Sequence, residues 1–321
     1  MKAVFIEQPG GRDALRYGDF AQPEAGPGQV LVKISVSGVN FIDTYHRSGL
    51  YKLPLPAVLG TEGAGTVAAI GEGVTGFRVG DPVAYAMARG SYAEYAAVPA
   101  HLVVRVPAGL NAQQAAAAML QGMTAHYLTH STFAIEPGHT ALVHAAAGGT
   151  GRLISQMVKL RGGKVIGTAG TREKAEVARK AGADEVILYR EQDLVGEVKR
   201  LTDGKGVEVV YDGVGEATFM QSLDCLKPRG MMATFGNASG PVKAFDPLLL
   251  SAKGSLFLTR PTLANYSSPD EVKWRSSDVL GWILNKKLDL LIERVYPLAD
   301  AAQAHADLEG RKTTGKLILT V

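Results

Sequence analysis

A glycine-rich turn near the middle of the chain constrains the fold more than any other feature of the sequence. Residues 141–145 form an apolar run typical of a buried strand, and the next six residues read Ala-Ala-Gly-Gly-Thr-Gly. A helical pattern follows at once, with apolar residues recurring on one face from Leu153 to Val158. Glycines in such a turn let the backbone approach a pyrophosphate, and the following helix offers free N–H groups. We therefore predict a dinucleotide-binding turn at Gly148, Gly149, Thr150 and Gly151.

Strand-like and helix-like segments alternate on the C-terminal side of this turn. The runs that we interpret as strands cover residues 141–145, 164–168, 185–188, 208–211 and 231–235. Strands that alternate with helices form βαβ units, and nearly all-apolar strands are typical of a sheet that is buried on both faces. We predict an α/β fold with a doubly wound parallel sheet, a Rossmann domain, over residues 124–265.

The first third of the chain has a different rhythm, with short β-like runs that are separated by glycine and proline turns. This pattern predicts a compact, barrel-like β domain over residues 1–123, and an alanine-rich helix at residues 111–123 with Asn111 as its N-cap. After residue 266 the sequence predicts helices at 271–284 and 299–308 and a closing strand at 316–321. Because so few elements could hardly form a third hydrophobic core, we expect residues 266–321 to complete the first domain.

Composition excludes several classes of protein. Hydrophobic residues make up 46% of the chain and charged residues 20%, and no apolar run approaches the roughly 18 residues of a membrane span. The net charge of +3 is small and the cations are scattered, so we do not expect nucleic acid as a partner. One cysteine, Cys225, allows no intrachain disulfide and no multi-cysteine zinc site. With no signal peptide expected at the N-terminus, these features predict a cytoplasmic enzyme.

The end of the second predicted strand indicates which cofactor binds. An enzyme that uses NAD usually places an acid there to hold the ribose hydroxyls, but residues 167–171 contain none and Arg172 and Lys174 follow. A cation can bind a 2′-phosphate through charge-assisted hydrogen bonds, so we predict NADPH, with Thr171 as the N-cap of the next helix. The alternative is that Lys174 is only a solvated residue on a helix.

Six segments, spread in order over nearly the whole chain, resemble one family. They are residues 38–45, 60–65, 145–151, 182–186, 189–190 and 235–237. The chain is similar to the zeta-crystallin-like quinone oxidoreductases of the medium-chain dehydrogenase superfamily. This resemblance implies a GroES-like catalytic domain, a Rossmann domain, bound NADPH and a homodimer, in which residues 254–259 form an edge strand that pairs with its copy.

The resemblance also implies site residues. Those near the nicotinamide are Asn40, Phe41, Ile42, Asp43, Thr44 and Thr124. Gly148 to Gly151 match the pyrophosphate turn, and Gly170, Lys174 and Tyr189 match the 2′-phosphate end. Further cofactor contacts are implied for Asn237, Phe257, Leu258, Thr259 and Arg311. The chain departs from the family at Thr150, where valine is common, and at Gly213, where a serine is common and its cofactor contact is in doubt.

No metal site is predicted. Where the zinc enzymes of this fold place a cysteine and a histidine, this chain has Asn40 and Thr61. His126 and His130 have helical i, i+4 spacing, but no third ligand is evident, and we interpret them as structural. Without a metal, the protein must hold a flat acceptor over the nicotinamide and offer it a hydrogen bond. Asn40, Tyr45 and Tyr51 are the candidate catalytic residues, although each tyrosine could simply be a core aromatic.

The function predicted from the sequence is NADPH-dependent reduction of a small planar quinone. An NADPH-dependent reductase of activated C=C bonds, such as those of enones or enoyl thioesters, would share the same fold and hydride donor. A structural, crystallin-like role or the binding of AU-rich RNA is the alternative from another class, and the intact cofactor turn argues against it as the main role.

Overall fold

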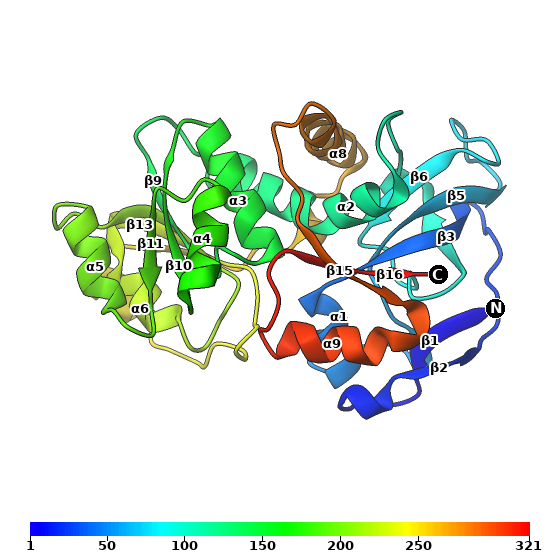
Figure 1. The fold of residues 1–321 in the computed structure, drawn as a ribbon, viewed down its shortest axis with the longest axis horizontal. Coiled ribbons are helices and arrows are strands. Elements are labelled where there is room, and N and C mark those ends of the chain that lie inside the picture. Colours follow the sequence, from blue (N-terminus) through cyan, green and yellow to red (C-terminus); the bar gives the residue numbers. More distant parts are fainter. The chain divides into compact units, whose positions relative to one another are not determined.

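The computed structural model describes all residues from Met1 to Val321. It divides into two compact units (Figure 1). Unit 1 comprises Met1–Met123 and Tyr266–Val321, and unit 2 comprises Thr124–Asn265. No helix of either unit has both the length and the apolar character that crossing a membrane requires.

Unit 1 is built on two β-sheets. A small sheet has the strand order β2-β1-β4, and a seven-stranded sheet has the order β15-β16-β3-β5-β6-β8, with β7 pairing with β3. The strands are β1 (Lys2–Ile6), β2 (Arg16–Asp19), β3 (Gln29–Val39), β4 (Ala57–Val58), β5 (Glu62–Ile70), β6 (Pro82–Ala86), β7 (Tyr95–Pro99), β8 (Val103–Arg105), β15 (Ile292–Pro297) and β16 (Lys316–Thr320). The last strand, β16, runs antiparallel to β3, so the C-terminal segment completes the N-terminal sheet.

Four α-helices belong wholly or mainly to unit 1. They are α1 (Phe41–Ser48), α2 (Ala112–Tyr127), α8 (Pro269–Leu284) and α9 (Ala301–Glu309). The predicted N-cap of α2 is confirmed, because Asn111 Oδ1 accepts a hydrogen bond of 2.8 Å from the N–H of Gln114. The helix is longer than predicted: it continues to Tyr127 and then into a π-helical turn at Leu128–Thr132. Apolar side chains of β1, β16 and α9 pack together in one hydrophobic core of this unit.

Unit 2 contains a six-stranded parallel sheet with the order β11-β10-β9-β12-β13-β14. Its strands are β9 (Thr140–Val143), β10 (Lys164–Ala169), β11 (Glu185–Leu188), β12 (Val207–Asp212), β13 (Leu226–Thr234) and β14 (Phe257–Thr259). The chain moves outward from β9 in one direction and then from β12 in the other. The carboxyl ends of β9 and β12 therefore flank the switch point at which ligands bind in such sheets.

The helices of unit 2 cover both faces of this sheet. They are α3 (Gly149–Leu160), α4 (Arg172–Lys180), α5 (Leu194–Leu201), α6 (Phe219–Asp224) and α7 (Leu248–Ala252). In Figure 1, α3 and α4 lie on one side of the strands and α5 and α6 on the other. The central strands are therefore almost wholly buried, as their apolar sequences predict. The strand predicted at residues 141–145 ends earlier, at Val143, because the backbone already turns at Ala145, whose φ is +49°.

Candidate active site and cofactor site

The glycine turn of unit 2 has the geometry of an anion site. Helix α3 begins at Gly149, and its N-cap, Gly148, provides no side-chain cap to the first turn. The first N–H groups of a helix lack partners within it, and together with the helix dipole they favour a negative charge. A Cβ atom on Gly151 would lie 2.4 Å from the carbonyl oxygen of Ala145, so only glycine allows the helix to start this close to the strand.

A buried polar cluster fixes this turn from within the sheet. His144 Nδ1 lies 3.2 Å from Thr168 Oγ1, and its Nε2 lies 2.9 Å from Ser222 Oγ. Thr168 Oγ1 also accepts the N–H of Ala145, at 3.2 Å, and Ser222 donates to Asp212. Burial lowers the pKa of His144, so the ring is held neutral. The cluster joins the ends of β9, β10 and β12. Sequence reasoning missed it, although polar residues that end apolar strands were a signal.

Two of the residues predicted for the 2′-phosphate, Gly170 and Tyr189, meet at the ends of β10 and β11. Thr171 caps α4 as predicted, with its side chain accepting the N–H of Lys174. A Cβ atom on Gly170 would lie 2.7 Å from the hydroxyl of Tyr189 and 3.4 Å from Nε of Arg190. The structure thus brings Gly170, Tyr189 and Arg190 together next to the start of α4. Arg190 was not predicted as a site residue, but its place directly after Tyr189 in a matched segment could have indicated it.

The other predicted cofactor residues of unit 2 lie farther along the same sheet. Asn237 follows β13, and Phe257 to Thr259 are the edge strand β14. A Cβ atom on Gly213 would lie 3.0 Å from the ring of Phe235. A side chain at this position would need that ring to give way by a few tenths of an ångström. Thr124 begins the part of α2 that belongs to unit 2, and Arg311 lies in unit 1 after α9, with a φ of +52°.

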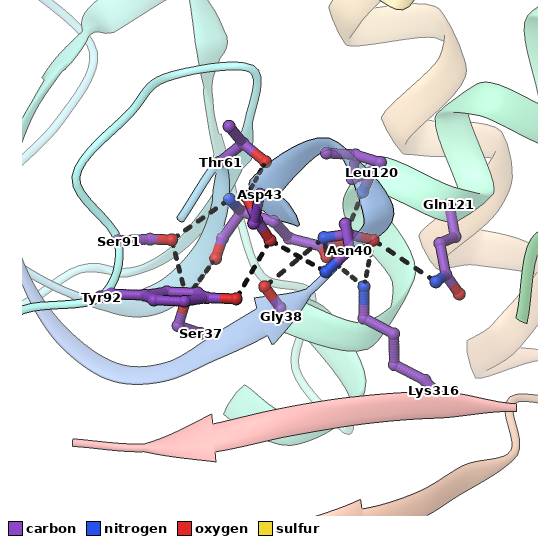
Figure 2. A network of polar contacts seen from close by, with 11 residues as sticks. Ser37, Gly38, Asn40, Asp43, Thr61, Ser91, Tyr92, Leu120, Gln121 and Lys316 are labelled. Atoms are coloured by element: carbon purple, nitrogen blue, oxygen red, sulfur yellow. Dashed lines mark hydrogen bonds and ion pairs between the residues drawn. The ribbon is translucent and has the colours of Figure 1, made fainter. Parts of the chain in front are cut away.

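In unit 1, Asp43 is an interior residue rather than an exposed one. Its side chain is fully buried and accepts hydrogen bonds from Asn40 N at 2.9 Å, Thr61 Oγ1 at 3.0 Å and the Tyr92 hydroxyl at 3.1 Å (Figure 2). Burial raises the pKa of Asp43 to about 7, against the effect of these three hydrogen bonds. Both carboxylate oxygens are occupied, so the structure does not place this side chain for contact with a cofactor. Thr44 is also buried, with its hydroxyl donating to Phe41 O at 2.7 Å.

The side-chain amide of Asn40 is held on both ends. Its Nδ2 donates to Glu62 Oε2 at 2.8 Å and more weakly to Gly38 O at 3.4 Å. Its Oδ1 accepts from Lys316 Nζ at 2.8 Å and from Gln121 Nε2 at 3.4 Å. Both amide hydrogens are therefore engaged, and the structure does not support the expectation that Asn40 donates to an acceptor oxygen. Sequence reasoning missed Glu62, Lys316 and Gln121, although a lone charge in an apolar strand was a signal for the first two.

The two candidate tyrosines form an aromatic pair at the end of α1. The ring centroids of Tyr45 and Tyr51 lie 5.3 Å apart with an interplanar angle of 67°, and Tyr51 N donates to Tyr45 O at 3.1 Å. Phe41 extends the row, with its ring 6.2 Å from that of Tyr45. Tyr45 is buried and Tyr51 is half-buried. His46 packs against Tyr51, and burial and the nearby Arg89 lower its pKa to about 4.

Comparison with known proteins places this geometry in a family. Residues 26–108 match the alcohol dehydrogenase GroES-like domain, and residues 149–269 match the family described as zinc-binding dehydrogenase. A quinone oxidoreductase of Pseudomonas aeruginosa is 46% identical over 321 residues, which cover 99% of each chain. The chain belongs to the quinone oxidoreductase family. The predicted family and the predicted fold class, a GroES-like domain with a Rossmann domain, are confirmed.

Two further relatives of this quinone oxidoreductase chain bear on its chemistry. The structure of Escherichia coli quinone oxidoreductase in complex with NADPH superposes with a TM-score of 0.98, at 42% identity and with 100% of both chains covered. A 2-haloacrylate reductase from a Burkholderia species is 41% identical over 329 residues, which cover 99% of this chain and 98% of that protein.

Residues 149–269 match a family described as zinc-binding dehydrogenase, but the side chains of this quinone oxidoreductase do not fit a zinc ion. No group of three or more His, Cys, Asp or Glu side chains could hold a metal anywhere in the chain. Asn40 and Thr61, at the expected ligand positions, have their polar atoms engaged within the protein. The ammonium group of Lys316 already lies against Asn40 and Glu62. His126 and His130 stack with ring centroids 4.0 Å apart, and His126 is fully buried.

Proposed function

We propose that this protein transfers a hydride from NADPH to a small planar quinone without a metal ion. The observation that carries the proposal is the uncapped glycine turn at the end of β9, at the switch point of the sheet, with Gly170, Tyr189 and Arg190 gathered beyond the next strand. Together these features supply what NADPH requires: N–H donors for a pyrophosphate, and a hydroxyl and a cation for a 2′-phosphate. The NADPH complex of the E. coli relative supports this choice of cofactor.

Each part of the site has a proposed role. The N–H groups at Gly148 to Gly151 bind the pyrophosphate, and Lys174, Tyr189 and Arg190 bind the 2′-phosphate. Further cofactor contacts are proposed for Phe41, Ile42, Thr124, Asn237, Phe257 to Thr259 and Arg311. NADPH supplies the hydride.

Tyr45 and Tyr51 are proposed to hold the acceptor. Their edge-to-face arrangement places aromatic rings at the end of α1, and a flat ring stacks favourably on aromatic side chains. A quinone needs no metal to stabilise its reduced form, because the developing charge spreads over the ring and the oxygen becomes basic enough to take a proton from water. The acceptor class that fits best is therefore a small quinone rather than an alcohol.

A second candidate function is the reduction of activated C=C bonds. The 2-haloacrylate reductase, whose name states such a substrate, is 41% identical over nearly the whole chain. The same fold and the same hydride donor would serve both acceptors. The quinone proposal stands first because several relatives along the full length, including the P. aeruginosa and E. coli proteins, carry the quinone name.

We also propose that the protein forms a homodimer through β14. This short strand is the edge of the parallel sheet and pairs only with β13, and Phe257 on it is 58% exposed. An apolar edge strand is usually covered or paired. Pairing of β14 with its copy across a two-fold axis would join two sheets.

The experiment that tests the proposed function distinguishes an enzyme from an RNA-binding protein. NADPH oxidation with 1,4-benzoquinone is measured beside retention of an AU-rich RNA on a filter at physiological salt. We expect rapid turnover and no retention. RNA retention without turnover would contradict the proposal.

A further inference from the structure

Lys316 and Glu62 form a buried ion pair next to Asn40, the residue that precedes α1. The side chains of Lys316 and Glu62 are 2% and 0% exposed, and the ammonium group donates to Glu62 Oε2. The β16–β3 register pairs Leu317 with Val39, so Lys316, the first residue of β16, lies beside Asn40. A charge pair without access to water is costly unless its geometry and its other hydrogen bonds are good. Such a pair therefore needs a reason.

The pair fixes the orientation of the Asn40 amide. Lysine can only donate hydrogen bonds and a carboxylate can only accept them. Lys316 Nζ therefore faces the amide oxygen, 2.8 Å away, and Glu62 Oε2 faces the amide nitrogen, also 2.8 Å away. If the amide rotated by half a turn, both contacts would become repulsive. The two charges together permit only one of its two orientations.

The surrounding chain is built to admit this pair. A Cβ atom on Gly38 would lie 2.0 Å from Glu62 Oε2 and 2.9 Å from Lys316 Cε, so glycine is required there. The second carboxylate oxygen of Glu62 accepts the N–H of Leu120 at 2.5 Å. Strands β3, β5 and β16 and helix α2 thus all converge on the pair, as Figure 2 shows for Gly38, Leu120 and Lys316.

The orientation is passed on to a residue that is not fully buried. With its oxygen toward Lys316, Asn40 accepts a second hydrogen bond from Gln121 Nε2 at 3.4 Å. Gln121 lies on α2 and is only half-buried, unlike Asn40, Glu62 and Lys316. A row of hydrogen bonds therefore leads from the two buried charges through Asn40 to the side-chain amide of Gln121, which is partly exposed to solvent.

We propose that Lys316 and Glu62 are positioning residues for the reaction and that they act through Asn40. They hold the amides of Asn40 and Gln121 in a single orientation next to the start of α1, where Phe41 and Ile42 are proposed to contact the cofactor. This inference rests on the proposed function in one respect, the cofactor contacts proposed for Phe41 and Ile42, which directly follow Asn40 in the chain. Neither charged residue needs to touch cofactor or substrate.

A coupling experiment tests this proposal. Lys316→Met and Glu62→Gln are combined so that no buried charge is left unpaired, and kcat is measured in the presence and absence of Asn40→Ala. We expect the double variant to lose about tenfold or more in kcat with Asn40 present, and less than about twofold once Asn40 is alanine. KM for NADPH should change little. Equal losses in both backgrounds, or an unchanged kcat in either Asn40→Ala or the double variant, would overturn the proposal.

The matched control is an exposed ion pair of the same unit, Lys2 with Asp19, whose side chains are 48% and 82% exposed. Lys2→Met with Asp19→Asn should leave kcat unchanged. Thermal unfolding of every variant separates a loss of folded protein from a loss of positioning, because a purely structural pair would lower the melting temperature equally with and without Asn40.

A second readout does not depend on catalysis. Protein labelled with ¹⁵N at asparagine gives a side-chain amide signal for Asn40, identified by its absence in Asn40→Ala. Its hydrogens should exchange slowly with solvent and should lose protection by about tenfold or more in the double variant. An unchanged exchange rate overturns the inference whatever the acceptor is. Absence of NADPH–quinone turnover in the unmutated protein would instead overturn the proposed function and leave this test intact.

Discussion

The hydroxyl of Tyr92 joins Asp43 on α1 to His305 on α9, with distances of 3.1 Å to Asp43 Oδ2 and 3.1 Å to His305 Nε2. Arg47 can only donate, and it lies 3.1 Å from Nδ1 of the same histidine. Nδ1 of His305 therefore accepts a hydrogen bond from Arg47, and Nε2 carries the ring hydrogen and donates it to the Tyr92 hydroxyl. The Tyr92 hydroxyl in turn donates its hydrogen bond to Asp43. Burial and the nearby Arg47 lower the pKa of His305 to about 3, which keeps this ring neutral.

This arrangement predicts how stability depends on pH. Because the folded-state pKa of Asp43 is raised to about 7, the native protein binds more protons at this site than the unfolded chain between about pH 4 and pH 7. The stability from this group is full below the unfolded pKa and is lost as pH rises through about 7, by at most roughly 4 kcal/mol. Asp43→Asn removes this dependence.

The measurement is the difference in unfolding free energy between Asp43→Asn and the unmutated protein, from urea titrations at pH 5, 6 and 7. The buried histidines have lowered pKa values, so they make the unfolding free energy rise with pH. Because both proteins contain them, this contribution cancels in the difference. The variant should become more stable relative to the unmutated protein as pH rises. The control is Asp203→Asn at an exposed position, for which the difference in unfolding free energy should not change with pH. A difference that does not change with pH for Asp43→Asn would refute the assignment.

Lys174 is predicted to decide between NADPH and NADH. A charge-assisted hydrogen bond contributes about 1.5–3 kcal/mol, so Lys174→Ala should reduce the preference for NADPH in kcat/KM by roughly 10- to 150-fold. Turnover with NADH should be spared. Lys180→Ala, on the exposed last turn of the same helix, is the control and should keep the preference. Equal kcat/KM for both cofactors in the unmutated enzyme would sink the 2′-phosphate assignment.

Tyr51 is predicted to act on the acceptor rather than on the cofactor. Tyr51→Ala removes the ring that packs against Tyr45, and stacking contributes about 0.5–1.5 kcal/mol beyond area burial, so KM for the quinone should rise roughly 2- to 12-fold. KM for NADPH should rise less. Tyr51→Phe keeps the ring and should behave like the unmutated enzyme, as should Tyr17→Ala at an exposed position. A larger effect on NADPH than on quinone would contradict this role.

The edge strand β14 is predicted to carry the dimer. Light scattering at micromolar concentration should give twice the chain mass of 33.9 kDa. Phe257→Glu places a charge on the edge and should shift the protein toward the monomer, whereas Val79→Glu, 68% exposed in unit 1, should not. A monomeric mass for the unmutated protein would contradict the proposed dimer.

The elements that sequence reasoning predicted correctly are those whose cause is local. The glycine turn before α3, the Asn111 and Thr171 caps and the run of βα units each depend on residues within a few positions of one another. The lengths of α2 and β9 were less well predicted: α2 continues to Tyr127 and into a π-helical turn, and β9 ends before the left-handed backbone at Ala145.

The Asn40 network could not be predicted in the same way. Lys316 and Asn40 are 276 residues apart, and only the pairing of β16 with β3 brings them together. The family resemblance implied residues 40–44 as one contact segment, yet the helix turns Asp43 and Thr44 into the interior. Asn40, assigned from its position, proved to be engaged by partners that nothing in its neighbourhood indicates.

The most direct test of metal-free hydride transfer from NADPH to a quinone is a comparison of acceptors in the presence of a strong chelator. Initial rates are measured with 1,4-benzoquinone, an enone and an enoyl thioester with NADPH, and with a primary alcohol with NADP⁺. We predict that the quinone reacts fastest and that the chelator has no effect. Turnover of the alcohol as the fastest reaction, or loss of quinone activity that added zinc restores, would contradict the account.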